Sequence, residues 1–171
     1  MANVNFKGVS TDSGADAFLY LKTKRAGVLK GESTVPDHAD EIQVQGWRWG
    51  VSSSSAIGHQ AATSRRSYTA LTIEKSIDSA TTALLATLAT NDEVVEAKLS
   101  MRRAGGEQET YFTILLKGAR VTGLEHGFDA AGGTLETVTI NFLKIEIEYR
   151  PQKTTGLRSG TMTFSDDLTP H

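Results

Sequence analysis

One strand pattern in this sequence changes phase halfway along, and few folds accommodate such a change. Residues 136–150 (ETVTINFLKIEIEYR) alternate apolar and polar side chains twice, and the first apolar series ends at Phe142 where the second begins at Leu143. Successive side chains of a strand point to opposite faces, so a slip of one residue indicates a β-bulge or a sharp bend. Long strands that bend in this way wrap sheets into closed barrels, and two strands joined by a tight corner are the alternative.

Other short runs rich in Val, Ile, Thr and aromatic residues predict further strands. These runs lie at residues 17–22, 41–52, 68–77, 94–103, 109–117 and 160–164. The small residues at 104–107 indicate a hairpin turn between two of them. We therefore expect a mainly β fold, namely a compact antiparallel β-barrel with one flanking α-helix.

The helix is predicted between residues 80 and 90. Apolar residues recur there at helical spacing, Asp78 or Ser79 can cap the start, and Asn91 can end it. The other side of this helix consists of Thr and Ala without charge. We expect that side to pack against another protein surface, and exposure to solvent is the alternative.

Length, charge and cysteine content exclude several classes of protein. The 171 residues suit a single domain. A formal net charge of -2 gives no support for a nucleic-acid partner, and the apolar runs are far shorter than the roughly 20 residues that span a membrane. The absence of cysteine excludes disulfides and thiol chemistry, and the first 16 residues lack the apolar region of a signal peptide.

Two long segments, 52–67 and 123–134, are rich in small residues and lack the periodicity of core elements. Loops longer than about 12 residues in a compact domain are usually functional or disordered. We expect both segments to be loops, and at least the first to have a functional role.

No arrangement of residues predicts an active site. The four histidines have none of the spacings of metal-binding motifs: they are His38, His59, His126 and His171. The serines at 52–55 lack the closing glycine of a nucleophile elbow, and Glu146 and Glu148 alternate with isoleucines on the polar face of a strand. We expect no catalytic residue, no metal and no cofactor, which favours a binding or assembly role.

Five short motifs follow one another in order between residues 18 and 153. They are KGES at 30–33, HADEI at 38–42 leading into WRWG at 47–50, Lys75 with Asp78, RAGG at 103–106 and YRPQK at 149–153. Together they resemble the Hcp (hemolysin-coregulated protein) family of bacterial type VI secretion systems. The motif positions are Lys30, Gly31, Glu32, Ser33, His38, Trp47, Trp49, Gly50, Lys75, Asp78, Gly105, Gly106, Tyr149, Pro151 and Gln152.

The resemblance implies a structural tube subunit and not an enzyme. Six copies of the barrel would close into a ring, and stacked rings would form a tube that a contractile sheath propels behind a spike protein. The protein would be made in the bacterial cytoplasm, secreted to the outside or into a target cell, and would carry effectors in its lumen. The loop after the tryptophan strand would reach a neighbouring ring through Ser54, Ile57, His59, Arg65 and Arg66.

The resemblance covers a core at roughly 17–153 of the single domain 1–171, and the tail at 154–171 diverges. The residues KTKRAG at 22–27 have no counterpart in the family pattern. A tail-tube protein of a related phage-like machine is the first alternative. The second is a small β-barrel hydrolase or binding protein, which requires a pocket that gathers His38, His126 and nearby carboxylates.

Overall fold

The structure is a computed structural model that describes residues 16–54, 65–103, 109–151 and 160–170. Within these residues the chain forms thirteen strands, the α-helix α1 (Thr81–Ala89) and the short 3-10 helix η1 (Pro36–His38). The predicted mainly β class is confirmed. In the described part of the chain, no helix has the length and apolar character needed to cross a membrane.

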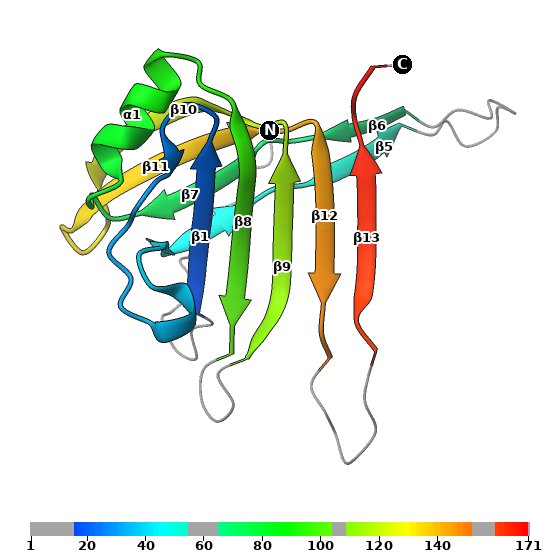
Figure 1. Cartoon of the computed structure of the whole chain (residues 1–171), viewed down its shortest axis with the longest axis horizontal. Helices are drawn as coiled ribbons and strands as arrows, with labels where there is room; N and C mark the ends of the chain where they lie inside the picture. The colour runs from blue at the N-terminus through cyan, green and yellow to red at the C-terminus, as the bar shows by residue number, and fades with distance from the viewer. Residues whose placement is uncertain (1–15, 55–64, 104–108, 152–159, 171) are drawn as a thin grey trace, which may run out of the picture.

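The largest unit is a sheet of seven antiparallel strands (Figure 1). Its centre consists of β1 (Asp16–Thr23), β8 (Val94–Arg102) and β9 (Thr110–Lys117). On one side the sheet continues through β12 (Lys144–Tyr149) to β13 (Met162–Asp167). On the other side both β2 (Gly27–Val28) and β3 (Ile42–Val44) pair with β1.

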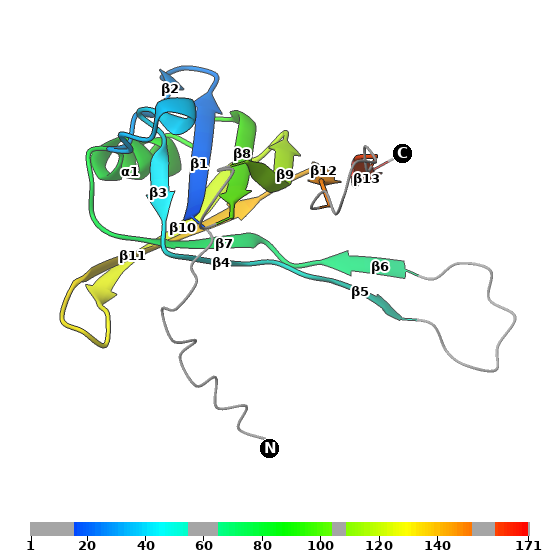
Figure 2. The ribbon, with the colours of Figure 1, turned by 90° about the horizontal axis from the view of Figure 1, so that it is seen from below.

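A second sheet, of four strands, runs across one face of the first (Figure 2). Its order is β10 (Arg120–Phe128), β11 (Thr134–Asn141), β7 (Leu71–Lys75) and β4 (Gly46–Arg48). Beyond β4 and β7 the chain continues into β5 (Val51–Ser54) and β6 (Arg65–Tyr68), which pair with each other and leave the body of the molecule. We call this two-stranded ribbon the arm.

The core lies between the two sheets and beneath α1. Alternate residues of each strand face it, as the strand period requires. Leu19 and Leu21 of β1, Leu99 of β8 and Ile140 of β11 are all buried there, and Leu84 brings α1 onto the same cluster. Both sheets and α1 thus share one core in the described residues.

The predicted closed barrel is wrong, because the two sheets do not close on each other. In the described residues β13 pairs only with β12, and β10 pairs only with β11, so each sheet ends in an open edge. The alternating pattern changes phase where the chain turns a corner from one sheet to the other. It does not mark a bend within one strand of a barrel, and the chain therefore forms two layers.

The corner itself lies at the predicted position. β11 ends at Asn141 in the four-stranded sheet, and β12 begins at Lys144 in the seven-stranded sheet. Between them Phe142 and Leu143 turn the chain, and the Leu143 N–H donates to the carbonyl of Lys117 at 3.3 Å. The change of direction is therefore present as the alternative, two strands joined by a tight corner, and not as a bulge or bend within one strand.

Two sequence predictions about single segments are wrong. Residues 41–52 form parts of three strands, which pair in turn with β1, β7 and β6. Both faces of this segment are semi-apolar, so it can change partners without burying charge. Most of 123–134 is strand β10, with only a turn left at 129–133; the exposed edge position of β10 explains its small and polar residues.

The helix confirms the sequence prediction and shows how its ends are held. Asp78 does not cap α1 directly, but its Oδ1 accepts the N–H of Ala80 at 2.9 Å in the preceding turn. At the other end Asn91 has a φ of 51°, and the N–H groups of Asn91 and Asp92 bond the carbonyls of Leu88 and Thr87. This pattern is the Schellman motif.

Candidate functional site

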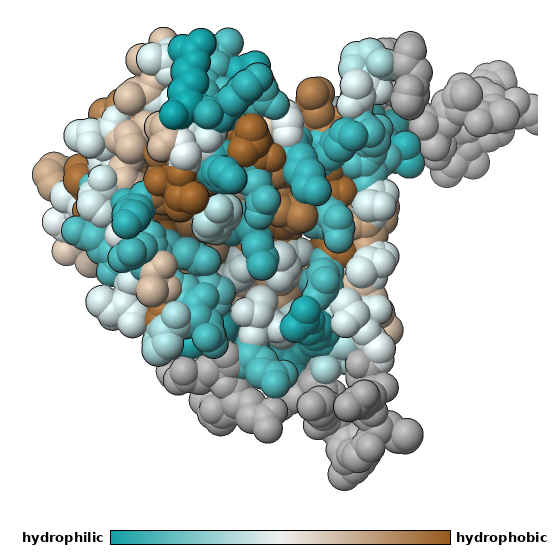
Figure 3. Space-filling model, in the orientation of Figure 1, coloured by the Kyte–Doolittle hydropathy of each residue, from teal (hydrophilic) through white to brown (hydrophobic). Residues whose placement is uncertain are grey.

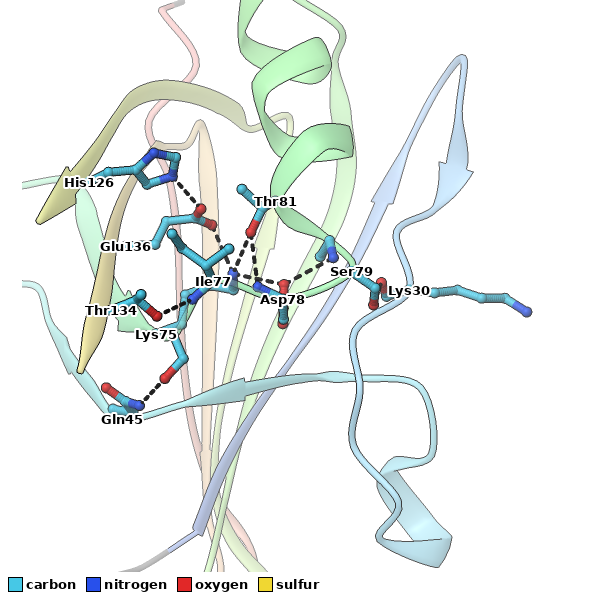
Figure 4. A network of polar contacts seen from close by, with 12 residues as sticks. Lys30, Gln45, Lys75, Ile77, Asp78, Ser79, Thr81, His126, Thr134 and Glu136 are labelled. Carbon is cyan, nitrogen blue, oxygen red and sulfur yellow. Dashed lines mark hydrogen bonds and ion pairs between the residues drawn. The ribbon is translucent and has the colours of Figure 1, made fainter. Parts of the chain in front are cut away.

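A buried lysine organises the polar interior of the protein (Figure 4). Lys75 ends β7, whose inward-facing positions begin with Leu71 and Ile73, and its side chain is fully buried. The ammonium group donates to Glu136 Oε1 on β11 at 2.8 Å, and it lies 2.8 Å from Asp78 Oδ1. Charges with so little access to water persist only when they are paired, and here one cation has two carboxylate partners.

The second oxygen of Glu136 extends this network to β10. Glu136 Oε2 lies 2.7 Å from Nε2 of His126, whose side chain is 40% exposed. Burial alone would raise the pKa of Glu136, but hydrogen bonds from Lys75 and His126 outweigh burial and hold that pKa below its ordinary value. The carboxylate therefore stays ionised and joins β7, β10 and β11 to the start of α1.

His38 has a packing role. Its ring lies flat on Phe18 with the centroids 4.5 Å apart, and its Nδ1 lies 2.8 Å from Glu41 Oε2. The side chain is only 8% exposed. Among the described residues His38 and His126 thus belong to separate contacts, which does not favour the hydrolase or binder alternative.

The first motif holds the chain before β3. Gly31 donates its N–H to the carbonyl of Asp40 at 2.7 Å, and Ser33 donates to Glu41 at 3.1 Å. A Cβ at Gly31 would stand 2.5 Å from the Glu41 carbonyl oxygen. Only glycine fits such a close approach between two backbones. The side chains of Lys30 and Glu32 are exposed, so this motif acts through its backbone.

Aromatic motif residues line the side on which the sheets part. Trp47 stacks on Phe112 with centroids 6.2 Å apart, and Trp49 stacks on Tyr68 at 6.2 Å. Tyr149 ends β12 and is half-exposed. Gly50 and Pro151 are among the described residues, and neither has a polar side chain. Gly105, Gly106 and Gln152 lie outside the described residues.

The arm occupies the segment expected to reach a neighbouring ring. Ser54 and Arg65 face each other at the end of its described part, and Ile57 and His59 lie outside the described residues. The expected loop is therefore, in its described part, a pair of strands. An antiparallel ribbon holds its direction better than a loop does, because every second residue pair is joined by hydrogen bonds.

A clamp joins the base of the arm to β13. The Tyr68 hydroxyl donates to Asp166 Oδ2 at 2.6 Å, and Arg66 donates to Asp166 Oδ1 at 3.2 Å. Burial and the bonded carboxylate both raise the pKa of Tyr68, so its hydroxyl keeps its proton. The clamp connects the last described strand of the large sheet to the ribbon.

The outward face of the seven-stranded sheet is polar and shallow. Figure 3 shows hydrophilic side chains across most of it, with apolar ones gathered mainly in its upper half. A hollow of about 330 Å³ is lined there by Lys117, Lys144, Glu146 and Asp167, among others, and no histidine lines it. Hydrogen bonds from Thr169 hold the pKa of Asp167 at about 2. Glu146 lies on the polar face as predicted.

The described residues contain no metal-binding cluster, because no three of their His, Asp or Glu side chains are placed to hold a metal ion. Lys75 comes together with Glu136 and Asp78, and the charges of these groups are paired with one another. Sequence patterns did not identify Glu136 as the partner of Lys75, or His126 as the second partner of Glu136. A charge at a core-facing strand position was the available signal for Glu136.

The chain is similar to proteins of type VI secretion. The family model described as "Type VI secretion system effector, Hcp" matches residues 20–149. The chain is 34% identical over 140 residues to "Protein hcp1" of Pseudomonas aeruginosa, covering 80% of this chain and 86% of that protein. The crystal structure of Hcp1 from Salmonella typhimurium superposes with a TM-score of 0.70 at 25% identity, covering 90% of this chain and 95% of that one. An Hcp1 structure from E. coli EAEC 042 gives a TM-score of 0.75 at 20% identity over 90% of this chain and 99% of that one.

Proposed function

Because the chain belongs to the Hcp family of type VI secretion proteins and is a tube protein of that system, we propose that its copies close into six-membered rings that stack into a hollow tube. The observation that carries the stacking proposal is the arm, a ribbon that projects from the body and is joined to it by Tyr68 and Arg66, which both bond Asp166. A projection of this kind is available to a second molecule. The role is structural, and no catalytic residue is assigned.

The partners and the route follow from the tube proposal. The outer surface of stacked rings would meet the contractile sheath, the tube end would carry the spike protein, and effectors would occupy the lumen. The tube would leave the bacterial cytoplasm for the outside or for a target cell. The weakly charged helix α1, whose Leu85 is 42% exposed, is our candidate for the surface that meets the sheath or a neighbouring subunit.

The ring proposal predicts annular particles of the purified protein in negative-stain micrographs. The full chain is expected to give rings of uniform diameter, and a mass near six times that of one chain by light scattering. Heterologous contacts close only when the rotation per copy divides the circle evenly, so one ring size should dominate. Compact monomers at high protein concentration would contradict the proposal.

The arm proposal predicts that shortening the arm separates stacking from ring closure. Ser54 and Arg65 are direct cross-strand partners, so residues 55–64 can be replaced by Asn-Gly, which closes a two-residue hairpin. We expect this variant to keep single rings and to lose stacks of rings, measured by microscopy and by sedimentation.

A second variant replaces the same residues with a Gly-Ser sequence of equal length and so keeps the reach of the arm. If stacking depends on the side chains of the segment, including Ile57 and His59, both variants lose it; if it depends on reach, only the short variant does. Undiminished stacking in the short variant would contradict the inter-ring role. A monomeric short variant would contradict it as well, because the arm would then serve ring closure.

A further inference from the structure

The core-facing side of the seven-stranded sheet continues beyond the core as an apolar surface. Phe112 of β9, Tyr149 of β12 and Met162 of β13 are direct partners across three neighbouring strands. Residues that face each other directly across a ladder point to the same side of a sheet. Two residues further along, this side passes through Ile114, which is buried in the core, and Phe164. The apolar side chains of β12 and β13 therefore lie on the same face of the sheet as the core.

The four-stranded sheet covers only part of this surface. Trp47 of β4 stacks on Phe112 and is itself 37% exposed. Beyond it Met162 is 63% exposed and Phe164 is 46% exposed. The arm contacts β13 near its C-terminal end, where Tyr68 bonds Asp166. Met162, at the N-terminal end of β13, stays exposed. We call Trp47, Phe112, Tyr149, Met162 and Phe164 the mouth patch.

A second exposed apolar group lies at the β10–β11 turn. Phe128 ends β10 and is 79% exposed, the most exposed of the large apolar side chains described. Thr134 is its direct cross-strand partner, and the Thr134 hydroxyl accepts the N–H of Ile77, which is also exposed. Phe128 and Ile77 therefore flank Thr134 on its two sides, and we call them the tip patch.

The tip is held in a fixed shape. The Asp129 carboxylate accepts the N–H groups of Ala131 at 2.9 Å and Gly133 at 2.8 Å, and the Asp129 N–H donates to the Gly133 carbonyl at 2.9 Å. Gly132 supplies the positive φ that the turn needs. A turn that is already held in shape loses little conformational entropy when its aromatic side chain binds a partner, which favours a binding hot spot.

The two patches lie on opposite sides of the molecule. In Figure 1 the β10–β11 turn is at the left and β13 at the right, so one copy cannot cover its own mouth patch with its own tip patch. Large exposed apolar side chains that gather in patches are typical of protein interfaces.

We propose that the tip patch of one copy docks into the mouth patch of the next copy, so that copies associate head to tail around the ring. This proposal rests on the ring proposed above and names the two surfaces that close it. A contact between two mouth patches would stop at two copies and would leave both tips bare. The head-to-tail contact covers both patches of every copy and continues until the ring closes.

The absence of cysteine from the natural chain permits a clean cross-linking test. Met162→Cys and Phe128→Cys are made as separate chains, one with a mass tag, and each is treated with a short bis-maleimide alone and after mixing and reassembly. We expect a cross-linked dimer that contains both chains in the mixture and none from either chain alone. Mixing Phe128→Cys with Val28→Cys is the control, because Val28 is 43% exposed and belongs to neither patch.

A second set of variants measures assembly directly. Phe128→Glu and Met162→Glu are each expected to lose annular particles while keeping the circular dichroism spectrum of the native chain, and Val28→Glu is expected to keep rings. Rings that persist in Phe128→Glu and Met162→Glu would overturn the patch assignment alone. Cross-linking of either cysteine chain with itself, or its absence from the mixture, would overturn the head-to-tail contact. A native chain that forms no rings would instead overturn the proposed function.

Discussion

Replacing Lys75 with methionine is expected to lower the free energy of unfolding by about 3–5 kcal/mol, because the change removes the buried cation that is paired with the buried Glu136 carboxylate. Lys75 is fully buried and touches Glu136 and Asp78 at 2.8 Å each. Methionine keeps most of the volume, so the cost comes from the charge and not from a cavity. Urea denaturation followed by circular dichroism measures the change, and the melting temperature should fall by roughly 10 °C.

The matched control removes both charges of the pair. A Lys75→Met, Glu136→Leu double variant buries apolar groups in place of the ion pair, and such replacements are often neutral. We expect it to recover more than half of the stability lost in the single variant, even though Asp78 also loses its contact with Lys75. A single variant that loses less than about 1 kcal/mol would show that the charges are not paired and buried as described.

Gly31→Ala is expected to lower the free energy of unfolding by about 2–3 kcal/mol. The added methyl would meet the Glu41 carbonyl oxygen at 2.5 Å and Ile42 Cα at 2.6 Å, both of them backbone atoms. A flexible side chain could move aside, but these atoms belong to the approach to β3 and its buried Ile42. Thermal and urea denaturation measure the effect.

Gly127→Ala is the control for the change from glycine to alanine. Nothing lies within 4 Å of a Cβ built at Gly127, and its backbone needs no positive φ. Its stability should change by no more than about 0.5 kcal/mol. Equal effects at the two positions would mean that the close approach at Gly31 is not what makes glycine necessary there.

Patterns of period two predicted most of the strands, because burial of one face repeats at every second residue. The central strands β1, β8 and β9 lie within two residues of their predicted ranges, and the helix does as well. The same period-two pattern also indicated a buried charge. Glu136 shares its parity with Val138 and Ile140, so a charge on the core face of β11 already pointed to a buried partner such as Lys75.

The sequence pattern could not predict whether the sheets close into a barrel. The change of phase at Phe142 and Leu143 is the same whether one strand bends or two strands meet at a corner, since both move the apolar side chains to the other face. Partner choice decides between them, and partner choice depends on contacts distant in sequence. Residues 41–52 show the same difficulty. Their β pattern is continuous, but they form parts of three strands that pair with three different partner strands.

The continuity between the arm and the four-stranded sheet has a mechanical consequence. β4 leads into β5, and β6 leads into β7, so tension on the arm pulls β4 and β7 along their own length. This pull moves β4 and β7 in the same direction and therefore loads the ladder between β7 and β11. The hydrogen bonds of an antiparallel ladder stand perpendicular to the strands, so the pull shears them together and does not unzip them one by one. A tube driven by a contracting sheath is loaded along its axis, and an arm joined to the body in this way would pass that load into the centre of each subunit.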